Sequence, residues 1–395
     1  MSNQIFIGDN LEVMSSHSFK KYHNKIKMIY IDPPYNTKSN KSYLDNYCSI
    51  NWSDFIKDRL SLTKDLLKED GVIFISIDDN ELVNLKIICE EIFGKSNFIG
   101  IFITQQSQRS NAKHINTVHE YILCFAKNKS RVPPFKISRL LLTKDKSIIN
   151  SLYTEIRPII NKQGIDIASK EISKIINKLC KENNISWLKN YNRIDVNGKI
   201  FFPMDLSTPN NPREINIPEI NLKLDALKNR GWATDQKFID LYKNNRLFFR
   251  NGRPYEKKYI EESYDNAPSV LNFFSRQGTN DLKKLGLSGL FDTPKPVDLV
   301  KFLILIATGE NDYILDFFAG SGTTAQAVYE VNAENNRSNN YILIQKNEKI
   351  NASNSVYKAC KTYNINPDIS DILIYRLNHY LSVNNKQKDY VISQH

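Results

Sequence analysis

Short apolar runs recur along the first third of the chain, each closed by a polar or turn-forming residue. The runs are almost continuously apolar, which is typical of strands in a sheet that helices cover on both faces. We expect these strands at Gln4–Ile7, Ile26–Ile31, Val72–Ile77, Phe98–Ile103 and Tyr121–Ala126.

Helical patterns separate several of these runs. Apolar residues at helical spacing predict a helix with an N-cap at Ser53 that runs to about Lys68 and is ended by Asp70-Gly71. Asp78-Asp79-Asn80 can cap a second helix, which ends at Phe93-Gly94. This alternation of strands and helices predicts the α/β class, with a Rossmann-like, doubly wound and mostly parallel sheet.

The alternation stops near residue 128 and resumes near residue 288. The stretch between is rich in Lys, Asn and Pro, and its clearest element is a helix over Ile165–Lys181. After residue 288 the pattern predicts a helix at Val297–Ala307 and a strand at Tyr313–Phe318. A tight turn at Ala319–Thr324 then opens a further helix, and a last strand follows at Tyr341–Ile344.

These changes of pattern predict four parts of the chain. Residues 1–128 and 288–350 form two halves of one α/β domain, and residues 129–287 are an inserted domain. Residues 351–395 are a C-terminal extension with a helix over Ile369–Leu381, after which we expect the polar end to fray.

The formal charge of +11 is concentrated in the insertion. Residues 131–270 carry 25 Lys and Arg against 16 Asp and Glu, whereas the rest of the chain is nearly balanced. A uniform compositional bias would not place the excess in one segment. The clustering therefore favours a segment that faces a polyanion such as nucleic acid.

Other features narrow the class of protein. The five cysteines are scattered without a C-x-x-C pair, and the six histidines are dispersed, so we expect reduced thiols in the cytoplasm and no metal. No apolar run is long enough to span a membrane, and residues 1–10 lack the pattern of a signal peptide.

A glycine-rich turn follows the predicted strand at Tyr313–Phe318. In Asp316-Phe317-Phe318-Ala319-Gly320-Ser321-Gly322, the glycines let the backbone approach a ligand closely, as in nucleotide sites. Thr323-Thr324 replaces the Gly-Lys-Ser/Thr of a P-loop, and Ala325 replaces the third glycine of G-x-G-x-x-G. Asp316 could accept from an ammonium group, which suits an amino-acid-bearing nucleoside. The alternative is an ordinary strand–turn–helix connection.

Asp32-Pro33-Pro34-Tyr35 closes the apolar run Ile26–Ile31. Proline has a fixed φ and no N–H, and it holds the preceding residue extended, so Asp32 should stand where the strand ends. An exocyclic amine on a base is a poor nucleophile because its lone pair is delocalised. The Asp32 carboxylate and the Pro33 carbonyl could accept both N–H groups while Tyr35 stacks on an extracted base. The alternative is a strand-ending turn with a surface tyrosine.

Together, Asp32-Pro33-Pro34-Tyr35 and Phe318-x-Gly320-x-Gly322 resemble the paired signature of S-adenosylmethionine-dependent amino-methyltransferases that act on DNA. The catalytic motif precedes the cofactor motif, with a recognition region between, as in the β class. Further segments of the chain resemble the modification subunits of type III restriction–modification systems. The segments concerned are Phe6–Leu11, Asp70–Asp78, His119–Leu123 and Thr293–Pro296.

The resemblance implies roles for individual residues. Asp32 and the Pro33 carbonyl would hold the target amine, with Pro34 between them and the stacking Tyr35. The S-adenosylmethionine site would comprise Asp9, Thr293, Lys295, Pro296, Asp316, Phe318, Ala319, Gly320, Ser321, Gly322, Thr323 and Glu348. Gln345 stands where an acidic residue usually binds the ribose, and Glu348 is the substitute.

Arginine suits guanine edges and phosphates, so basic and aromatic residues are the candidates for DNA contacts. They are Lys38, Lys41, Arg109, Arg230, Trp232, Arg246, Arg250, Arg253, Tyr255 and Lys257. The expected partner is double-stranded DNA; a homodimer and a separate restriction subunit with nuclease or helicase activity both stay open.

The expected reaction is methylation of adenine N6, because the motif begins with Asp and not Ser in the family pattern. Cytosine N4 methylation and a catalytically silent DNA-recognition subunit are the alternatives. A nicotinamide-dependent oxidoreductase is disfavoured by Ala325 at the third glycine position. An RNA substrate is disfavoured because the insertion lacks the aromatic platform of an RNA-recognition motif.

Overall fold

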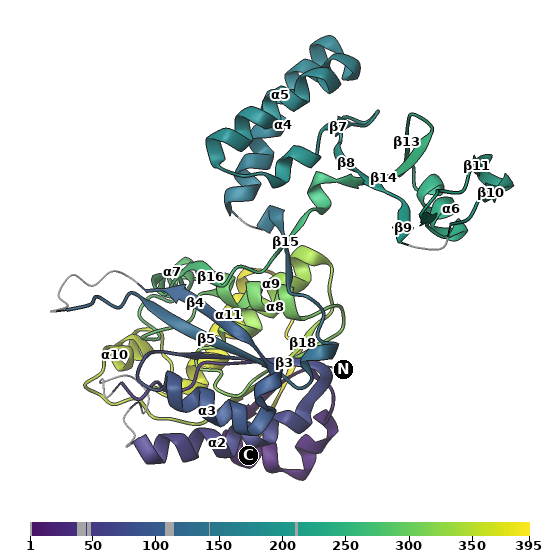
Figure 1. Cartoon of the computed structure of the whole chain (residues 1–395). Coiled ribbons are helices and arrows are strands. Elements are labelled where there is room, and N and C mark those ends of the chain that lie inside the picture. The colour runs from purple at the N-terminus through teal and green to yellow at the C-terminus, as the bar shows by residue number, and fades with distance from the viewer. Residues whose placement is uncertain (1, 38–44, 46–48, 107–113, 142, 210–211) are drawn as a thin grey trace. The chain divides into compact units, whose positions relative to one another are not determined.

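The computed structural model describes residues 2–37, 45, 49–106, 114–141, 143–209 and 212–395 (Figure 1). The chain divides into two compact units. Unit 1 comprises Met1–Phe135 and Ala267–His395, and unit 2 comprises Lys136–Asn266. Lys38, Lys41 and Arg109 lie outside the described residues.

Among the described residues of unit 1, nine strands form one sheet in the order β16-β4-β5-β3-β2-β17-β18-β1-β19. All neighbours are parallel except β5, which runs antiparallel to β3 and β4. This confirms the mostly parallel α/β sheet. The strands are β1 Asn3–Ile7, β2 Ile26–Ile31, β3 Leu67–Ile77, β4 Phe98–Gln105, β5 His119–Ala126, β16 Val270–Phe274, β17 Tyr313–Asp316, β18 Asn340–Gln345 and β19 Tyr390–Gln394.

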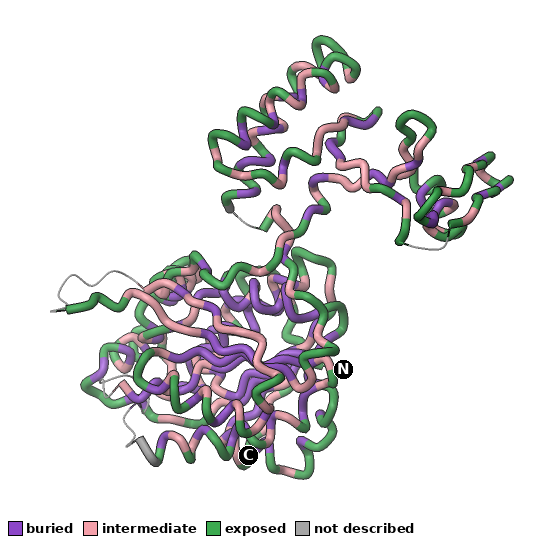
Figure 2. Tube along the Cα trace, in the orientation of Figure 1, coloured by how far each residue is buried: buried purple, intermediate pink, exposed green. Residues whose placement is uncertain are grey.

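Helices cover both faces of this sheet, so its central strands are buried on both sides (Figure 2). Alternate residues such as Ile73 and Ile75 share one hydrophobic cluster with α1 (Asn10–Ser15), α2 (Ser49–Leu66) and α3 (Leu82–Phe93). On the other face, Phe102 of β4 meets Phe302 of α8 (Val297–Ala307), and Tyr341 of β18 meets Tyr329 of α9 (Thr323–Asn335). Burial on both faces explains the near-continuous apolar runs.

The boundary between α2 and β3 differs from the prediction. Helix α2 begins at Ser49, not after Ser53, and ends at Leu66, while Asp70-Gly71 lies inside β3. A Cβ on Gly71 would stand 3.0 Å from the Ile26 carbonyl oxygen, so this glycine allows the close approach of β2 and does not end a helix.

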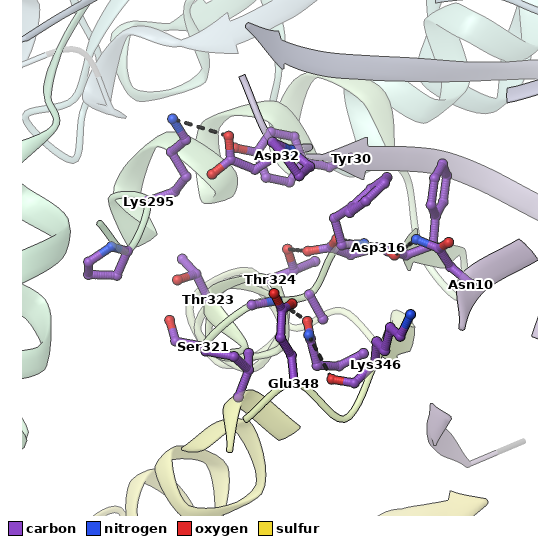
Figure 3. A pocket seen from close by; sticks show the side chains of 18 of the residues that line it. Asn10, Tyr30, Asp32, Lys295, Asp316, Ser321, Thr323, Thr324, Lys346 and Glu348 are labelled. Carbon is purple, nitrogen blue, oxygen red and sulfur yellow. Dashed lines mark hydrogen bonds and ion pairs between the residues drawn. The ribbon is translucent and has the colours of Figure 1, made fainter. Parts of the chain in front are cut away.

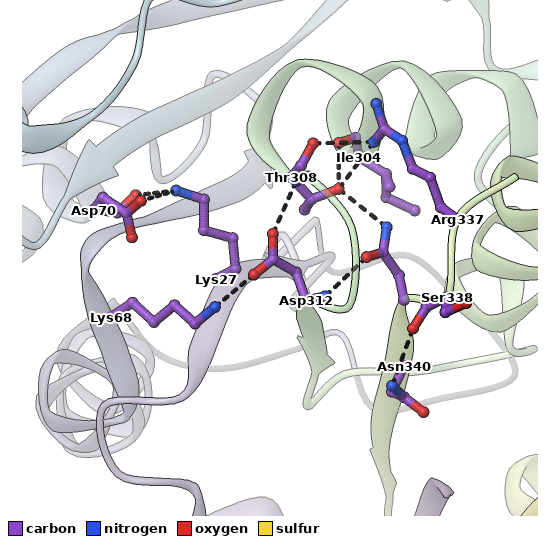
Figure 4. A network of polar contacts seen from close by, with 11 residues as sticks. Lys27, Lys68, Asp70, Ile304, Thr308, Asp312, Arg337, Ser338 and Asn340 are labelled. Atoms are coloured by element: carbon purple, nitrogen blue, oxygen red, sulfur yellow. Dashed lines mark hydrogen bonds and ion pairs between the residues drawn. The ribbon is translucent and has the colours of Figure 1, made fainter. Parts of the chain in front are cut away.

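An ion-pair network ties the same region together, as Figure 4 shows. Lys27 Nζ lies 2.6 Å from Asp70 Oδ2, and Lys68 Nζ lies 2.5 Å from Asp312 Oδ1 just before β17. These contacts join the amino ends of three strands, which leaves their carboxyl ends for ligands.

The C-terminal residues do not fray, and that prediction was wrong. After α10 (Ser355–Thr362) and α11 (Ile369–Val383), strand β19 pairs in parallel with β1. Asp389 anchors its start, because Asn3 Nδ2 donates to Asp389 Oδ2 at 3.0 Å and the Tyr329 hydroxyl donates to Asp389 Oδ1. The polar tail therefore extends the sheet.

Unit 2 contains a helical hairpin and a small sheet. Helices α4 (Thr143–Gln163) and α5 (Ile165–Asn183) pack around one apolar cluster. Only α5 was expected, because Pro158 interrupts the sequence pattern of α4. The remaining elements are β6 Lys136–Ser138, β7 Arg193–Ile194, β8 Ile200–Asp205, β9 Ser207–Pro209, β10 Ile215–Ile217, β11 Leu222–Leu224, β12 Arg230–Trp232, α6 Asp235–Lys243, β13 Leu247–Arg250, β14 Arg253–Tyr259 and β15 Tyr264–Asn266.

The compact unit is shorter at both ends than the inserted segment expected at 129–287. Residues 267–287 belong to unit 1, where β16 pairs with β4 and α7 (Arg276–Lys284) contacts α8. Helix α7 also packs tightly on the chain before α8, since a Cβ on Gly278 would stand 1.8 Å from the Pro294 carbonyl oxygen.

We predict that Gly278→Ala destabilises the protein by about 1–3 kcal/mol, because the added methyl has no room against the backbone of Pro294. Gly100→Ala in β4 is the matched control, since a Cβ there meets nothing within 4 Å. Urea denaturation of both variants measures the difference. Equal midpoints for the two variants would contradict the packing described.

Candidate functional site

A cavity of about 250 Å³ lies at the carboxyl ends of β1, β2, β17 and β18 in unit 1. This edge of a parallel sheet is where α/β folds bind ligands. Figure 3 shows Asp32 and Lys295 at one side of the cavity, and Glu348 and Lys346 at the other. Asp316 and Thr324 lie between these two groups (Figure 3).

The glycine-rich turn forms one wall of the cavity. Gly320 has φ 53° and Gly322, the N-cap of α9, has φ 83°, a region that glycine adopts without strain. The Gln345 side-chain oxygen accepts from the Gly320 N–H at 2.8 Å, which ties the turn to the end of β18. Gln345 therefore holds the turn at the position where an acidic residue was expected.

Asp316 is a buried carboxylate in the centre of this wall. The Phe318 N–H donates to Oδ1 at 3.0 Å and the Thr324 hydroxyl donates to Oδ2 at 2.5 Å. Burial raises the pKa of Asp316 to about 7. The described residues place no ion-pair partner on Asp316, so a cationic ligand group would complement it.

Asp9 is engaged within the protein. Its carboxylate caps α1 by accepting from the Leu11 N–H at 2.9 Å, and Arg59 Nη2 lies 3.1 Å from Oδ1. Arg59 also packs over the Phe55 ring, with the guanidinium carbon 3.7 Å from the ring centroid. Lys346 Nζ also lies 3.7 Å from Asp9 Oδ2, so Asp9 contributes to the cavity wall as a carboxylate shared by two cations.

Asp32 follows β2 and meets a lysine from the chain before α8. Lys295 Nζ lies 3.3 Å from Asp32 Oδ1, and it donates to the Tyr35 hydroxyl and to Glu120 Oε2, both at 2.7 Å. Burial raises the pKa of Asp32, although the Lys295 charge opposes that rise. Burial also acts against the Lys295 charge, but the carboxylates of Asp32 and Glu120 outweigh it and raise the pKa of Lys295.

The chain after Asp32 is held in place by side chains. The Trp52 indole N–H donates to the Pro34 carbonyl at 2.8 Å. Asn36, with φ 59°, donates its backbone N–H to Asp45 Oδ1 and its side-chain amide to Glu81 Oε1, each at 2.8 Å. None of the described residues donates a hydrogen bond to the Pro33 carbonyl.

Comparison with known proteins decides the family, because residues 26–354 match the N6/N4 DNA methylases. The chain belongs to the DNA methylase family. The resemblance to amino-methyltransferases of DNA is thereby confirmed.

Two relatives show which DNA methylases this chain is similar to. It is 31% identical over 400 residues to the type III restriction-modification enzyme EcoPI Mod subunit of Escherichia phage P1, over 90% of this chain and 59% of that protein. The chain thus spans about three-fifths of that relative. It is 29% identical over 398 residues to the type II methyltransferase M.KpnI of Klebsiella pneumoniae, over 96% of this chain and 87% of that protein.

A solved structure, the PvuII DNA methyltransferase (cytosine-N4-specific), superposes with a TM-score of 0.45 and 12% identity over 92% of each chain. Within the described part of this DNA methylase, no helix is long and apolar enough to cross a membrane. The same residues contain no group of three or more His, Cys, Asp or Glu placed to hold a metal ion.

Most residues expected at the site line the cavity. These are Asp9, Asp32, Pro34, Thr293, Lys295, Asp316, Phe318, Ala319, Gly320, Ser321, Thr323 and Glu348. Pro33, Tyr35, Pro296 and Gly322 do not line it: Tyr35 is only 7% exposed, and Gly322 packs toward Leu373 of α11.

Other lining residues were not expected from the sequence. They are Asn10, Tyr30, Phe55, Arg59, Phe291, Pro294, Phe317, Thr324, Gln345, Lys346 and Ile369. Asn10, Phe317 and Thr324 are direct neighbours of expected residues and could have been found on that basis. Arg59 and Ile369 come from distant helices and carry no local signal.

The candidate DNA contacts in unit 2 differ in exposure. Trp232 and Lys257 are buried, so their side chains do not offer contacts at the surface of this unit; the Trp232 indole donates to the Asp225 carbonyl. Arg246 and Arg253 are held in ion pairs with Glu262 and Asp205. Tyr255 is half-buried, and Arg230 and Arg250 are exposed.

A buried arginine of the C-terminal extension supports the glycine-rich turn. Arg376 of α11 is 0% exposed, and Nη1 donates to Ser321 Oγ at 2.6 Å and to Thr323 Oγ1 at 2.9 Å. Nη2 donates to Gln326 Oε1 at 2.9 Å. Burial lowers the pKa of Arg376 to about 10. Helix α11 is therefore part of the frame that shapes the cavity.

We predict that Arg376→Met lowers the free energy of unfolding by about 2–4 kcal/mol, because three buried acceptors lose their donor. Lys57→Met is the control, since it removes an ion pair with Glu91 in which both side chains are about half exposed. Thermal denaturation measures both. A melting temperature for Arg376→Met equal to that of Lys57→Met would show that the buried contacts are dispensable.

Proposed function

We propose that this DNA methylase transfers a methyl group from S-adenosylmethionine to adenine N6 in double-stranded DNA, as the modification component of a restriction–modification system. The observation that carries the proposal is the position of Asp32. Its carboxylate lines the same cavity as the glycine-rich turn and Asp316, at the carboxyl ends of adjacent strands.

The residues of the cavity fit S-adenosylmethionine. Asp316 suits the ammonium group of the methionine part, because it is a buried carboxylate without a cation among the described residues. Gly320 leaves backbone exposed to a ligand, and Glu348 supplies a carboxylate for the ribose hydroxyls. When bound, the cofactor supplies a methyl group on a sulfonium, which is activated for displacement.

The chain's own residues prepare the amine. The Asp32 carboxylate and the Pro33 carbonyl accept its two N–H bonds and turn its lone pair out of conjugation with the ring. The amine nitrogen would then attack the methyl carbon of the bound cofactor, with S-adenosylhomocysteine as the leaving group and one amine proton released; this requires positioning and no covalent bond to the protein. Tyr35, whose hydroxyl accepts from Lys295, is the proposed stacking partner of the base that has left the duplex; because this residue is only 7% exposed, stacking requires the ring to be uncovered locally.

Adenine is the proposed base because the motif begins with Asp32 in place of the serine of the cytosine-directed pattern. Cytosine N4 is the alternative, since the matched family includes both reactions. An aspartate with two acceptor oxygens serves either amine.

Unit 2 is proposed to recognise the DNA sequence. Arg230 and Arg250 are its exposed arginines among the candidates, and they suit phosphates or guanine edges. Several relatives are Mod subunits of type III restriction-modification enzymes, which supports a separate restriction subunit as a partner.

We predict that the protein labels DNA when incubated with methyl-labelled S-adenosylmethionine, and that nucleoside digestion yields N6-methyladenine. Asp32→Ala should lose methyl transfer by about a thousandfold or more, because an oriented acceptor is worth several kcal/mol in the transition state. The variant should still bind S-adenosylmethionine. Asp54→Ala, which alters an exposed residue of α2, should keep full activity.

Retained activity in Asp32→Ala would exclude its proposed role. N4-methylcytosine as the product would support the proposed methylation of an amine but show that the methylated base is cytosine, not adenine. Tight binding of a nicotinamide dinucleotide without any methyl transfer would instead support an oxidoreductase.

We predict that S-adenosylmethionine binds more weakly as the pH falls below 7, by up to about tenfold per pH unit. The ammonium group pairs with the ionised form of Asp316, whose pKa is about 7 in the folded protein. Asp316→Asn should bind more weakly at pH 7 and show no such dependence. Isothermal titration calorimetry from pH 5.5 to 7.5 measures this, and parallel profiles for the two proteins would contradict the role of Asp316.

A further inference from the structure

We propose that Lys295 and Glu120 are positioning residues: Lys295 faces the buried Oδ1 atom of Asp32 and keeps the carboxylate charged, while Glu120 holds the ammonium off-centre and so leaves Oδ2 to the target amine. This inference rests on the proposed function, and it assigns Lys295 to the amine side of the cavity in place of the cofactor side expected from the sequence.

The contacts of Lys295 are unequal. Its ammonium donates hydrogen bonds of 2.7 Å to Glu120 Oε2 and to the Tyr35 hydroxyl. Asp32 Oδ1 lies 3.3 Å away, close enough for an ion pair, yet it is buried and accepts no hydrogen bond from the described residues. Because Oδ1 is enclosed while the Asp32 side chain is 27% exposed, Oδ2 is the oxygen open to the target amine, and Lys295 supplies charge from the Oδ1 side.

Glu120 is what holds the ammonium in this off-centre position. Glu120 lies at the start of β5, opposite Thr104 of β4. Gln106 donates a side-chain hydrogen bond to Glu120 Oε1. The Tyr35 hydroxyl approaches Oε2 at 3.3 Å. Because both oxygens are engaged, the Glu120 carboxylate is fixed, and it draws the lysine away from Asp32.

The backbone that carries Lys295 is also fixed. Pro294 and Pro296 restrict the chain on either side, and α7 packs against it so closely that Gly278 has no room for a Cβ. The Lys295 ammonium is therefore held near Asp32 by a rigid segment, although the two residues are far apart in the sequence.

An unbonded buried carboxylate needs such a neighbour. The groups that face Asp32 are Lys295, Glu120, Tyr35, Tyr30 and Asp316, and Lys295 is the cation among them. Burial and Glu120 both raise the pKa of Asp32, and Lys295 opposes them. Without Lys295, Asp32 would stay protonated up to a higher pH, and a protonated carboxyl is a poorer acceptor for the amine N–H.

The experiment measures kcat/KM for DNA methylation against pH in the full chain. In Lys295→Met the acidic limb of the profile should move to higher pH by about one unit or more, because Asp32 loses its cation. Affinity for S-adenosylmethionine should change less than threefold, roughly 0.6 kcal/mol. Lys295→Arg keeps the charge and should return the limb toward that of the wild type.

Glu120→Gln tests the second half of the proposal. Releasing Lys295 from Glu120 lets its ammonium move over the Asp32 carboxylate and compete with the amine for Oδ2, so methylation should fall about tenfold or more at the optimal pH. Adding Lys295→Met should then recover activity at high pH, since it removes the competitor. Additive losses in the double variant would overturn the proposal.

Lys301→Met is the matched control. Lys301 also lies on the Lys295 side of the fold, in α8, and pairs with Glu330 and Glu334 at 3.0 and 2.6 Å, away from Asp32. The dependence of kcat/KM on pH in Lys301→Met should match that of the wild type. If the wild type methylates DNA and Lys295→Met keeps the same acidic limb, the positioning role is wrong; if the wild type itself transfers no methyl group, the proposed function is wrong.

Discussion

The parallel direction of β1, β2, β17 and β18 is the constraint on which the site depends. Parallel neighbours bring their carboxyl ends to one edge of the sheet, so Asp32 and Asp316 face one cavity although they are far apart in the sequence. Ion pairs at the opposite, amino edge fix the strands against each other there. The same geometry separates the carboxylate proposed for the amine from the carboxylate proposed for the cofactor.

Carboxylates that lie close together away from solvent are unfavourable unless their charges are balanced. In this protein the charge is balanced differently at each position. Asp9 has an arginine partner, and Asp32 has a lysine shared with Glu120. Within the described part of the chain the donors to Asp316 are neutral, so burial raises its pKa toward neutrality. A compensated carboxylate suits a neutral amine, and an uncompensated one suits a cation. This difference is the physical basis for placing substrate and cofactor as we propose.

The sequence predicted the parts of this fold whose signals are local. Asp32 and Asp316 each directly follow an apolar run, so their positions at strand ends could be deduced from neighbouring residues alone. Strand β19 was missed, because five polar and apolar residues form a strand only when β1 offers its edge. Arg376 was missed for a similar reason: a charged residue within a helix does not reveal that a distant turn supplies its partners. Lys295 was expected, but its contacts with Glu120 depend on tertiary structure.

A crystal structure of the protein with a DNA duplex and a non-reactive analogue of S-adenosylmethionine tests the central claim most directly. The account predicts an adenine outside the duplex, with its exocyclic nitrogen about 2.7–3.2 Å from Asp32 Oδ2 and from the Pro33 carbonyl oxygen. Lys295 should remain bonded to Glu120, and the analogue should lie between Asp32 and Asp316. A base bound elsewhere, or an Asp32 Oδ2 bonded to Lys295 with the base in place, would contradict it.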